Sequence, residues 1–186
     1  MRVGLPVPAG FVARRESREE SIRSAYDELK IREHTHYLAV RASHAQLDVI
    51  GNDALIHTLR RFWSESADIP ILIQCMVNGS WCGKAAYEGK NVRIRAGEGL
   101  LCLDPDSYVF NFAAHKCTRR TLYQRPRKVF RGVDGRTRTM EITGERQALD
   151  VQAMEKIAEL VKQAGGEITW VLDHRGVWLI SRKFGI

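Results

Sequence analysis

A dense run of arginine and lysine beyond the middle of the chain holds the residues best suited to chemistry. Between Lys116 and Arg138 the 186-residue sequence has nine basic residues and one acid, Asp134, so this segment carries a formal charge of +8. The whole chain carries +7, so the basicity belongs to this one segment. Arginine binds phosphate oxygens in a bidentate manner. Tyr123 and Phe130 stand among the arginines, a mixture that proteins use to stack bases over a cationic groove.

We therefore predict that phosphate or nucleic acid binds through residues 116–138. The predicted contacts are Arg119, Arg120, Arg125, Arg127, Lys128 and Arg131. Two alternatives stay open from the residues alone: the segment docks on an acidic protein surface, or it is a solvated hairpin without a specific partner. If several of these cations meet phosphates, binding should weaken steeply as salt rises.

The other reactive side chains match no established catalytic or metal-binding pattern. The sequence contains no P-loop, G-x-G-x-x-G, G-x-S-x-G or H-E-x-x-H pattern. Its four cysteines are not spaced as metal ligands, and we expect reduced, mostly buried thiols at Cys75, Cys82, Cys102 and Cys117. There is no signal-peptide pattern and no apolar run of membrane-spanning length, so we expect a cytoplasmic protein without membrane contact.

Hydrophobic periodicity predicts helices and strands in mixed order. Helices are expected at 16–30, at 148–163 and after residue 51, where Asn52 or Asp53 would supply the N-cap. Strands are expected around Phe11 and at 37–41, 69–77, 81–87, 91–96, 108–114, 168–173 and 177–182. Residues 128–131 and 136–142 flank Val133-Asp134-Gly135, which is typical of a hairpin tip. This order lacks βαβ regularity, so the predicted fold class is α+β.

Five segments, in order along the chain, carry a family resemblance. They are Gly4-Leu5-Pro6-Val7-Pro8-Ala9-Gly10-Phe11-Val12, Leu38–Ala45, Ile71–Val77, Gly97–Leu100 with Pro105–Tyr108, and the closing pattern Ile168–Asp173 with Val177–Arg182. They resemble the nucleotide-binding domain of phosphoenolpyruvate synthases and pyruvate phosphate dikinases, which is an ATP-grasp domain. In that family the first segment reads GxPVPxGFV, the second VAVRSSA, and the third is the strand along which the adenine lies.

The resemblance implies a reduced ATP-grasp-like fold, with backbone groups at 75–77 offered to the base. The nucleotide contacts it implies are Arg41, Gln74, Met76 and Glu98. It also implies losses, because the family's two metal ligands fall on Thr169 and Ser181, and hydroxyls are weaker magnesium ligands than carboxylates. The family's lysine-containing stretch and its phosphate flap have no counterpart in residues 1–186. ATP or ADP is the expected cofactor, whereas the lost ligands argue against magnesium.

We expect two lobes, residues 1–66 and 67–186, with the strand at 69–77 between them and a basic hairpin at 116–142. The expected function is a non-catalytic, degenerate ATP-grasp-like module. It would bind a phosphate-bearing partner, nucleotide or nucleic acid, through the remnant cleft and the hairpin. One alternative is an ATP-dependent phosphotransferase whose metal is held by Glu98, Asp104 and Asp106. The other is a subunit of a split phosphoenolpyruvate synthase-like enzyme that a partner chain completes.

Overall fold

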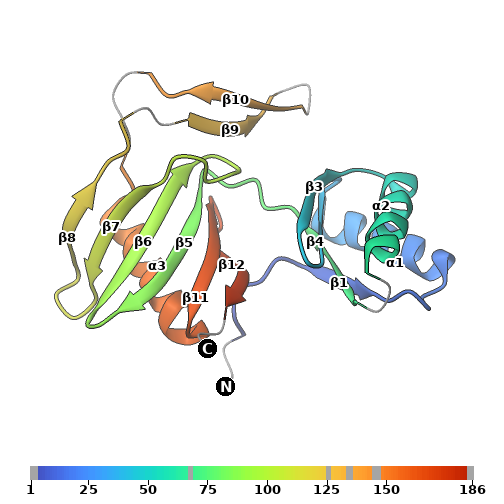
Figure 1. The fold of residues 1–186 in the computed structure, drawn as a ribbon, viewed down its shortest axis with the longest axis horizontal. Helices are drawn as coiled ribbons and strands as arrows, with labels where there is room; N and C mark the ends of the chain where they lie inside the picture. Colours follow the sequence, from blue (N-terminus) through green and yellow to red (C-terminus); the bar gives the residue numbers. More distant parts are fainter. Residues whose placement is uncertain (1–3, 67–68, 125–126, 133–135, 144–147, 184–186) are drawn as a thin grey trace. The chain divides into compact units, whose positions relative to one another are not determined.

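The computed structural model describes residues 4–66, 69–124, 127–132, 136–143 and 148–183. Within them the chain forms three helices and twelve strands (Figure 1). In chain order they are β1 (Gly10–Ala13), α1 (Glu19–Glu33), β2 (Leu38–Arg41), β3 (Ala45–Val49), α2 (Asn52–Glu65), β4 (Ile71–Cys75), β5 (Trp81–Glu88), β6 (Asn91–Glu98), β7 (Asp106–Asn111), β8 (Lys116–Thr121), β9 (Arg127–Arg131), β10 (Thr137–Glu141), α3 (Val151–Ala164), β11 (Glu167–Asp173) and β12 (Gly176–Lys183). None of the helices in these ranges is long and apolar enough to cross a membrane.

The chain divides into two compact units. The smaller unit is Pro8–Met76, and the larger unit joins Met1–Val7 to Val77–Ile186. The division therefore falls after Met76 rather than after residue 66. The strand expected between the lobes is β4, and it lies inside the smaller unit, where it pairs with β1 on one side and β2 on the other. The segment before β1 belongs to the larger unit, where the N–H of Leu179 donates to the carbonyl of Pro6 at 2.8 Å.

The smaller unit is an antiparallel sheet of order β1-β4-β2-β3 with α1 and α2 on one face (Figure 1). Alternate strand residues turn toward the helices, as the two-residue period of a strand requires. Each helix contributes an apolar stripe at helical spacing. The buried contacts that join the layers include Ile22, Tyr26, Leu29, Leu38, Val40, Leu55, Leu59, Phe62, Ile71 and Ile73. The predicted helix at 16–30 and the predicted strands at 37–41 and 69–77 are confirmed with shifted ends.

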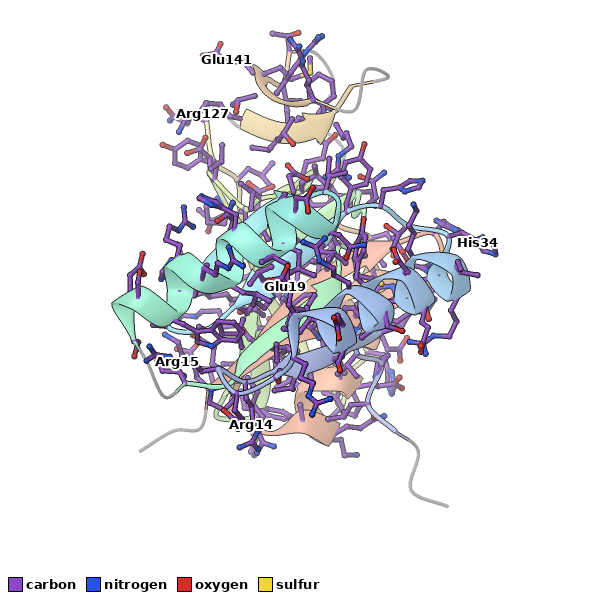
Figure 2. All side chains as sticks on the ribbon, turned by 90° about the vertical axis from the view of Figure 1, so that its right-hand side faces the viewer. Arg14, Arg15, Glu19, His34, Arg127 and Glu141 are labelled. Atoms are coloured by element: carbon purple, nitrogen blue, oxygen red, sulfur yellow. The ribbon has the colours of Figure 1, made fainter. Side chains whose placement is uncertain are left out.

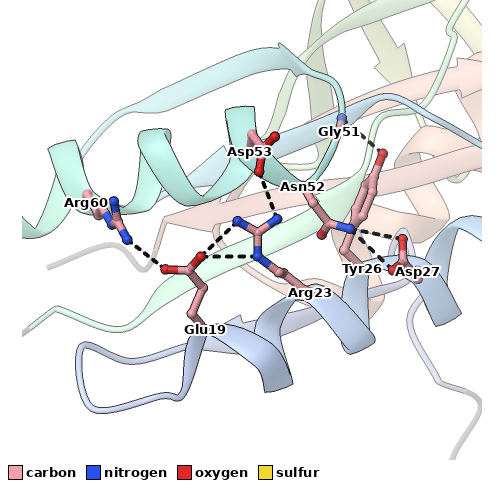
Figure 3. Close-up of polar contacts among 8 residues, drawn as sticks. All are labelled: Glu19, Arg23, Tyr26, Asp27, Gly51, Asn52, Asp53 and Arg60. Atoms are coloured by element: carbon pink, nitrogen blue, oxygen red, sulfur yellow. Dashed lines mark hydrogen bonds and ion pairs between the residues drawn. The ribbon is translucent and has the colours of Figure 1, made fainter.

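The start of α2 is fixed by α1 and not by a side-chain cap. Gly51 occupies the N-cap position with a φ of 87°, and no side chain caps the helix. The predicted caps point elsewhere, because Asn52 Nδ2 donates to Asp27 at 3.2 Å and Arg23 donates to Asp53 at 2.9 Å (Figure 3). The cap prediction was therefore wrong, since both polar side chains are used between the helices.

Glu19 is the centre of this contact between the helices. It accepts hydrogen bonds from Arg23 in its own helix at 2.8 Å and from Arg60 of α2 at 2.7 Å (Figure 3). The hydrogen bond from Arg23 is the main cause that lowers the pKa of Glu19. Two turns after Glu19 on α1, the hydroxyl of Tyr26 accepts from the N–H of Gly51 at 3.1 Å. Polar contacts thus align the exposed sides of α1 and α2.

The larger unit is built on an antiparallel sheet of order β12-β11-β5-β6-β7-β8, with α3 on one face (Figure 1). Asp150 caps α3 by accepting from the N–H of Ala153 at 2.6 Å. The apolar side of α3 packs on Tyr108, Phe110 and Trp170, which are fully buried. The predicted helix at 148–163 and the paired strands at 81–87, 91–96, 168–173 and 177–182 are confirmed. With helices packed on antiparallel sheets, the α+β class is also confirmed.

The basic segment is divided between two elements. Residues 116–121 form β8, the edge strand of the six-stranded sheet, which pairs with β7. Strands β9 and β10 pair with each other as a separate hairpin, whose tip at 133–135 lies outside the described residues. The hairpin is thus shorter than the expected 116–142. The turn signal at 133–135 was visible in the sequence, whereas the pairing of β8 with β7 was not. Cys117 of β8 packs against the core of the larger unit.

Candidate functional site

Two of the predicted nucleotide contacts lie on the same face of the smaller sheet. Leu38 and Val40 of β2 pack toward the helices, so Arg41 lies on the opposite face, paired in register with Leu72 of β4. Gln74 lies on that face too, because it pairs with Ala39 while Ile73 beside it packs in the core. Arg41 and Gln74 are therefore diagonal neighbours, two register positions apart, on the face that α1 and α2 do not cover.

The guanidinium of Arg41 is the most unusual polar group on this face. Its Nε is shielded from solvent and has no hydrogen-bond partner among the described residues. Burial lowers the pKa of Arg41, because the charged form loses hydration. An N–H donor that is held out of water without an acceptor weakens the fold, although the Arg41 side chain as a whole is only partly buried. The same group is well suited to an anionic ligand, since arginine presents several N–H donors in a fixed plane.

Gln74 has unused hydrogen-bonding capacity as well. Its side chain is 7% exposed, and its Nε2 donates to the carbonyl of Pro8 at 3.4 Å. Its Oε1 has no hydrogen-bond partner among the described residues. Gly10 lies opposite Gln74 on β1, where a Cβ would come within 2.2 Å of the Ile73 carbonyl oxygen. A larger residue at Gly10 would push β1 away from the Gln74 side chain.

The backbone N–H groups of Cys75 and Met76 are not available to a nucleotide base, although the resemblance implied that residues 75–77 would offer backbone groups to it. The N–H of Cys75 donates to the carbonyl of Ala9 at 2.8 Å, and the N–H of Met76 donates to the carbonyl of Tyr37 at 2.9 Å. Both donors are thus used within the smaller unit. Met76 follows directly after β4, and its backbone N–H is not available to a ligand.

In the larger unit, two of the predicted phosphate contacts hold the hairpin in place. Lys128 Nζ lies 2.9 Å from Glu98 Oε1, and Arg127 donates to both carboxylate oxygens of Asp104 at 2.8 and 3.3 Å. The N–H of Leu100 also donates to the carbonyl of Val129 at 2.7 Å. Arg127 is labelled at the start of β9 in Figure 2. Lys128 therefore joins β9 to the end of β6, and Arg127 joins β9 to the segment between β6 and β7.

The carboxylates that a relocated metal would need are already engaged. The hydrogen bond from Arg127 is the main cause that lowers the pKa of Asp104. Asp106 is 1% exposed and accepts from the N–H of Tyr123 at 2.8 Å and from the hydroxyl of Tyr108 at 3.1 Å. Within the described residues, no group of three or more His, Cys, Asp or Glu side chains is arranged to hold a metal ion. Glu98, Asp104 and Asp106 are thus each engaged by donors of the protein itself.

The remaining predicted phosphate contacts are dispersed. Arg119 and Arg120 are exposed on β8, where they pair in register with Val109 and Tyr108 and so lie on opposite faces. Arg131 ends β9 opposite Thr137. Arg125 lies outside the described residues. The sequence run therefore does not become a single cluster in the structure.

The four cysteines are free thiols, and only Cys82 is buried, whereas the other three are partly exposed. A hydrogen bond with Cys102, together with burial, raises the pKa of Cys82. The same hydrogen bond lowers the pKa of Cys102. A Cβ on Gly97 would lie 3.1 Å from the Cys102 Sγ, so the loop after β6 folds back over the end of that strand. The expectation of mostly buried thiols holds for one of the four.

Comparison with known proteins supports the fold. No family model and no curated protein matches the sequence. A D-alanine–D-alanine ligase from Bacillus anthracis superposes with a TM-score of 0.51 at 12% identity, covering 96% of this chain and 50% of the ligase. D-alanyl-alanine synthetase A from Vibrio cholerae O1 biovar eltor str. N16961 gives 0.51 at 14% identity, covering 94% and 48%.

The fold is ATP-grasp-like. The chain spans about half the length of the solved structures that it matches. At these identities the likeness extends to the fold alone. The ATP-grasp part of the sequence resemblance is thereby supported, and the phosphoenolpyruvate synthase family in particular is not.

Sequence reasoning overlooked the cations outside the basic segment. Lys84 of β5 and Arg93 and Arg95 of β6 are exposed and alternate with the buried residues Ala85 and Ile94. This alternation was visible in the sequence, because basic and apolar residues follow each other with a period of two. What the sequence could not show is which of these cations face each other across the sheet.

Proposed function

We propose that the protein is a non-catalytic, ATP-grasp-like binding module for a phosphate-bearing ligand, with ATP or ADP as its nucleotide. The observation that carries the proposal is the Arg41 Nε, which is shielded from solvent without a partner among the described residues. A ligand phosphate would supply the missing counter-charge and acceptor. Gln74 supports the same face, because its Oε1 is a buried acceptor that can receive an amino group such as that of adenine.

The non-catalytic part of the proposal rests on how the carboxylates are used. Phosphoryl transfer depends on positioned cations that neutralise the phosphates, and magnesium is usually held by carboxylates. Glu98 and Asp104 are paired with Lys128 and Arg127, so they are poorly placed to bind a metal as well. In this role the protein would bind the nucleotide without turning it over.

Calorimetric titration with ATP and ADP tests the proposal, using the wild-type protein, Arg41→Met and the control Arg15→Met. Arg15 is exposed in the same unit, and it is labelled in Figure 2. A charged hydrogen bond contributes about 1.5–3 kcal/mol, so Arg41→Met should weaken the Kd about 10- to 100-fold. Arg15→Met should leave the Kd unchanged. Equal affinities for wild-type and Arg41→Met would overturn the proposal.

A second candidate ligand is nucleic acid, which the exposed arginines of β8 favour. Arg119 and Arg120 project from an edge strand into solvent. Under this proposal, affinity for a short oligonucleotide falls steeply between two salt concentrations. It also falls in an Arg119→Gln/Arg120→Gln variant. Salt-independent binding, or binding that the variant retains in full, would remove β8 from the interface.

The synthase resemblance leaves one enzymatic alternative, in which the protein is a phosphoenolpyruvate synthase-like subunit completed by a partner chain. That chain would have to supply the lysine and metal ligands that the resemblance finds missing. The alternative gains support if a co-purifying chain restores magnesium-dependent ATP turnover. A protein that purifies alone and shows no turnover argues for the binding module.

A further inference from the structure

The register of the six-stranded sheet aligns one residue from every strand in a single row. Thr169 pairs with Ser181 on one side and with Lys84 on the other. Lys84 pairs with Arg95, and the row continues from Arg95 through β7 to β8. From edge to edge the row reads Ser181, Thr169, Lys84, Arg95, Ser107, Thr121, and we call it the Lys84–Arg95 row.

This row lies on the face of the sheet that α3 does not cover. Ala85, Ile94 and Ile168 are chain neighbours of row residues, and they pack in the core beneath α3. Successive strand residues point to opposite faces, so the row faces away from α3. Lys84 and Arg95 are exposed, and neighbouring strands lie about 4.8 Å apart, so the two cations are adjacent. Two hydroxyl side chains flank the pair on each side.

The charges on this face are unequal. Besides the row, the register places Arg93, Arg119, Lys116 and Lys183 on the same face, together with the acids Glu88, Glu167 and Asp173. Asp173 is occupied by Arg175 at 3.0 Å. Glu88 is occupied by Arg93 at 2.6 Å. Glu167 lies 3.8 Å from Lys84, and both side chains are about half exposed, so this pair is weak. No hydrogen bond or ion pair joins the Arg95 side chain to another described residue, so the face keeps an excess of positive charge.

A magnesium ion does not fit this place. Thr169 and Ser181 are the positions where the family resemblance puts the two metal ligands, and here they are cross-strand partners with hydroxyl side chains. The next residue in the row is a lysine and the one after it an arginine. A divalent cation would meet two weak ligands and like charge. Phosphate oxygens would meet hydroxyl donors and two cations, so these side chains favour an anion over a divalent cation.

We propose that the Lys84–Arg95 row binds the phosphate chain of a triphosphate ligand directly, without a divalent cation. Lys84 and Arg95 take over the neutralising role of the metal, and the hydroxyls of Thr169 and Ser181 donate to phosphate oxygens. The proposal concerns the larger unit alone and does not depend on Arg41. It makes magnesium a competitor, because a phosphate chain that is already neutralised by magnesium has less attraction for the row.

Calorimetric titration of the full-length protein with inorganic triphosphate at low salt, in EDTA or in excess magnesium, tests this proposal. Triphosphate should bind in EDTA and bind several-fold more weakly in magnesium. The variant Lys84→Gln/Arg95→Gln should weaken binding in EDTA at least 10-fold, with an unchanged far-ultraviolet spectrum showing that it folds. The control Lys156→Gln/Arg15→Gln removes the same charge from exposed positions elsewhere and should bind as the wild type does.

Three results would overturn the proposal: binding that requires magnesium, equal loss in the control, or full affinity in Lys84→Gln/Arg95→Gln. Arg41→Met separates this proposal from the proposed function, because the triphosphate binding that this variant keeps in EDTA should still be lost when Lys84 and Arg95 are replaced. If Arg41→Met abolishes that binding and the row variant does not, the Arg41 face stands and the row is rejected. Binding of an oligonucleotide to the row without any binding of triphosphate would also reject the proposal.

Discussion

Each unit has one sheet face that no helix of its own covers, and the two faces treat their cations differently. In the smaller unit the Arg41 Nε is shielded from solvent and lacks a partner among the described residues. In the larger unit Lys84 and Arg95 are exposed and adjacent in register. A shielded cation makes one costly, ligand-dependent interaction, whereas exposed cations act weakly and together. The comparison therefore predicts one face that depends on a single residue and one that depends on a row.

The largest effect should come from breaking the smaller face with Gly10→Ala. The new Cβ would lie 2.2 Å from the Ile73 carbonyl oxygen and 3.0 Å from Gln74 Cα, so β1 must move away from β4. We expect a loss of about 2–4 kcal/mol in the free energy of unfolding. ATP binding should weaken to what the Lys84–Arg95 row contributes, while binding of inorganic triphosphate is retained. Urea denaturation and calorimetry measure both.

The control is Gly4→Ala, where a Cβ would meet nothing within 4 Å. It should change neither stability nor binding. If Gly10→Ala is as stable as Gly4→Ala, the close approach of β1 to Gln74 is not needed for the face.

An intermediate effect should come from Asp173→Asn, which weakens one end of the row. Asp173 accepts from Trp178 Nε1 and from the N–H of Arg175, both at 2.9 Å, and so fixes the turn between the strands that carry Thr169 and Ser181. We expect a loss of about 1–2 kcal/mol at pH 7, with weaker triphosphate binding and unchanged nucleotide binding at the Arg41 face.

The effect of Asp173→Asn should depend on pH. Burial alone would raise the pKa of Asp173, but the hydrogen bonds from Trp178 and Arg175 outweigh it, and the pKa is lowered. A carboxyl with a lowered pKa in the fold stabilises above its unfolded pKa of about 3.9 and loses that contribution as the pH falls through the folded value. The difference between wild type and Asp173→Asn should therefore shrink below about pH 4. A constant difference down to pH 2 would contradict the assignment.

The smallest effects on the free energy of unfolding should come from Arg41→Met and Arg95→Met in the absence of ligand. The change caused by Arg41→Met should have the opposite sign to the losses above. Removing the partly buried Arg41 charge, whose Nε–H lacks an acceptor among the described residues, is expected to stabilise the smaller unit by about 1 kcal/mol. Removing an exposed charge from the larger unit should change stability by less than about 0.5 kcal/mol. Urea denaturation of both variants checks this, and destabilisation by Arg41→Met would mean that Arg41 is paired in the free protein.

The sequence predicted local structure better than it predicted the sites. The helix at 148–163 and the hairpin of β11 and β12 follow from apolar periodicity and a turn signal, both of which are local. Arg127 and Asp104 are 23 residues apart in the sequence, so no local pattern reveals that they pair. The Lys84–Arg95 row could not be predicted for the same reason, because the register between strands decides which cations lie next to each other.

Whether the protein binds ATP without a metal is measured by titrating the wild-type protein with ATP in EDTA and then in magnesium. We expect ATP to bind without a metal, with no improvement of the Kd in magnesium and no formation of ADP. Binding that appears only with magnesium, or magnesium-dependent release of ADP, would contradict it and show that this ATP-grasp-like fold has kept a metal site.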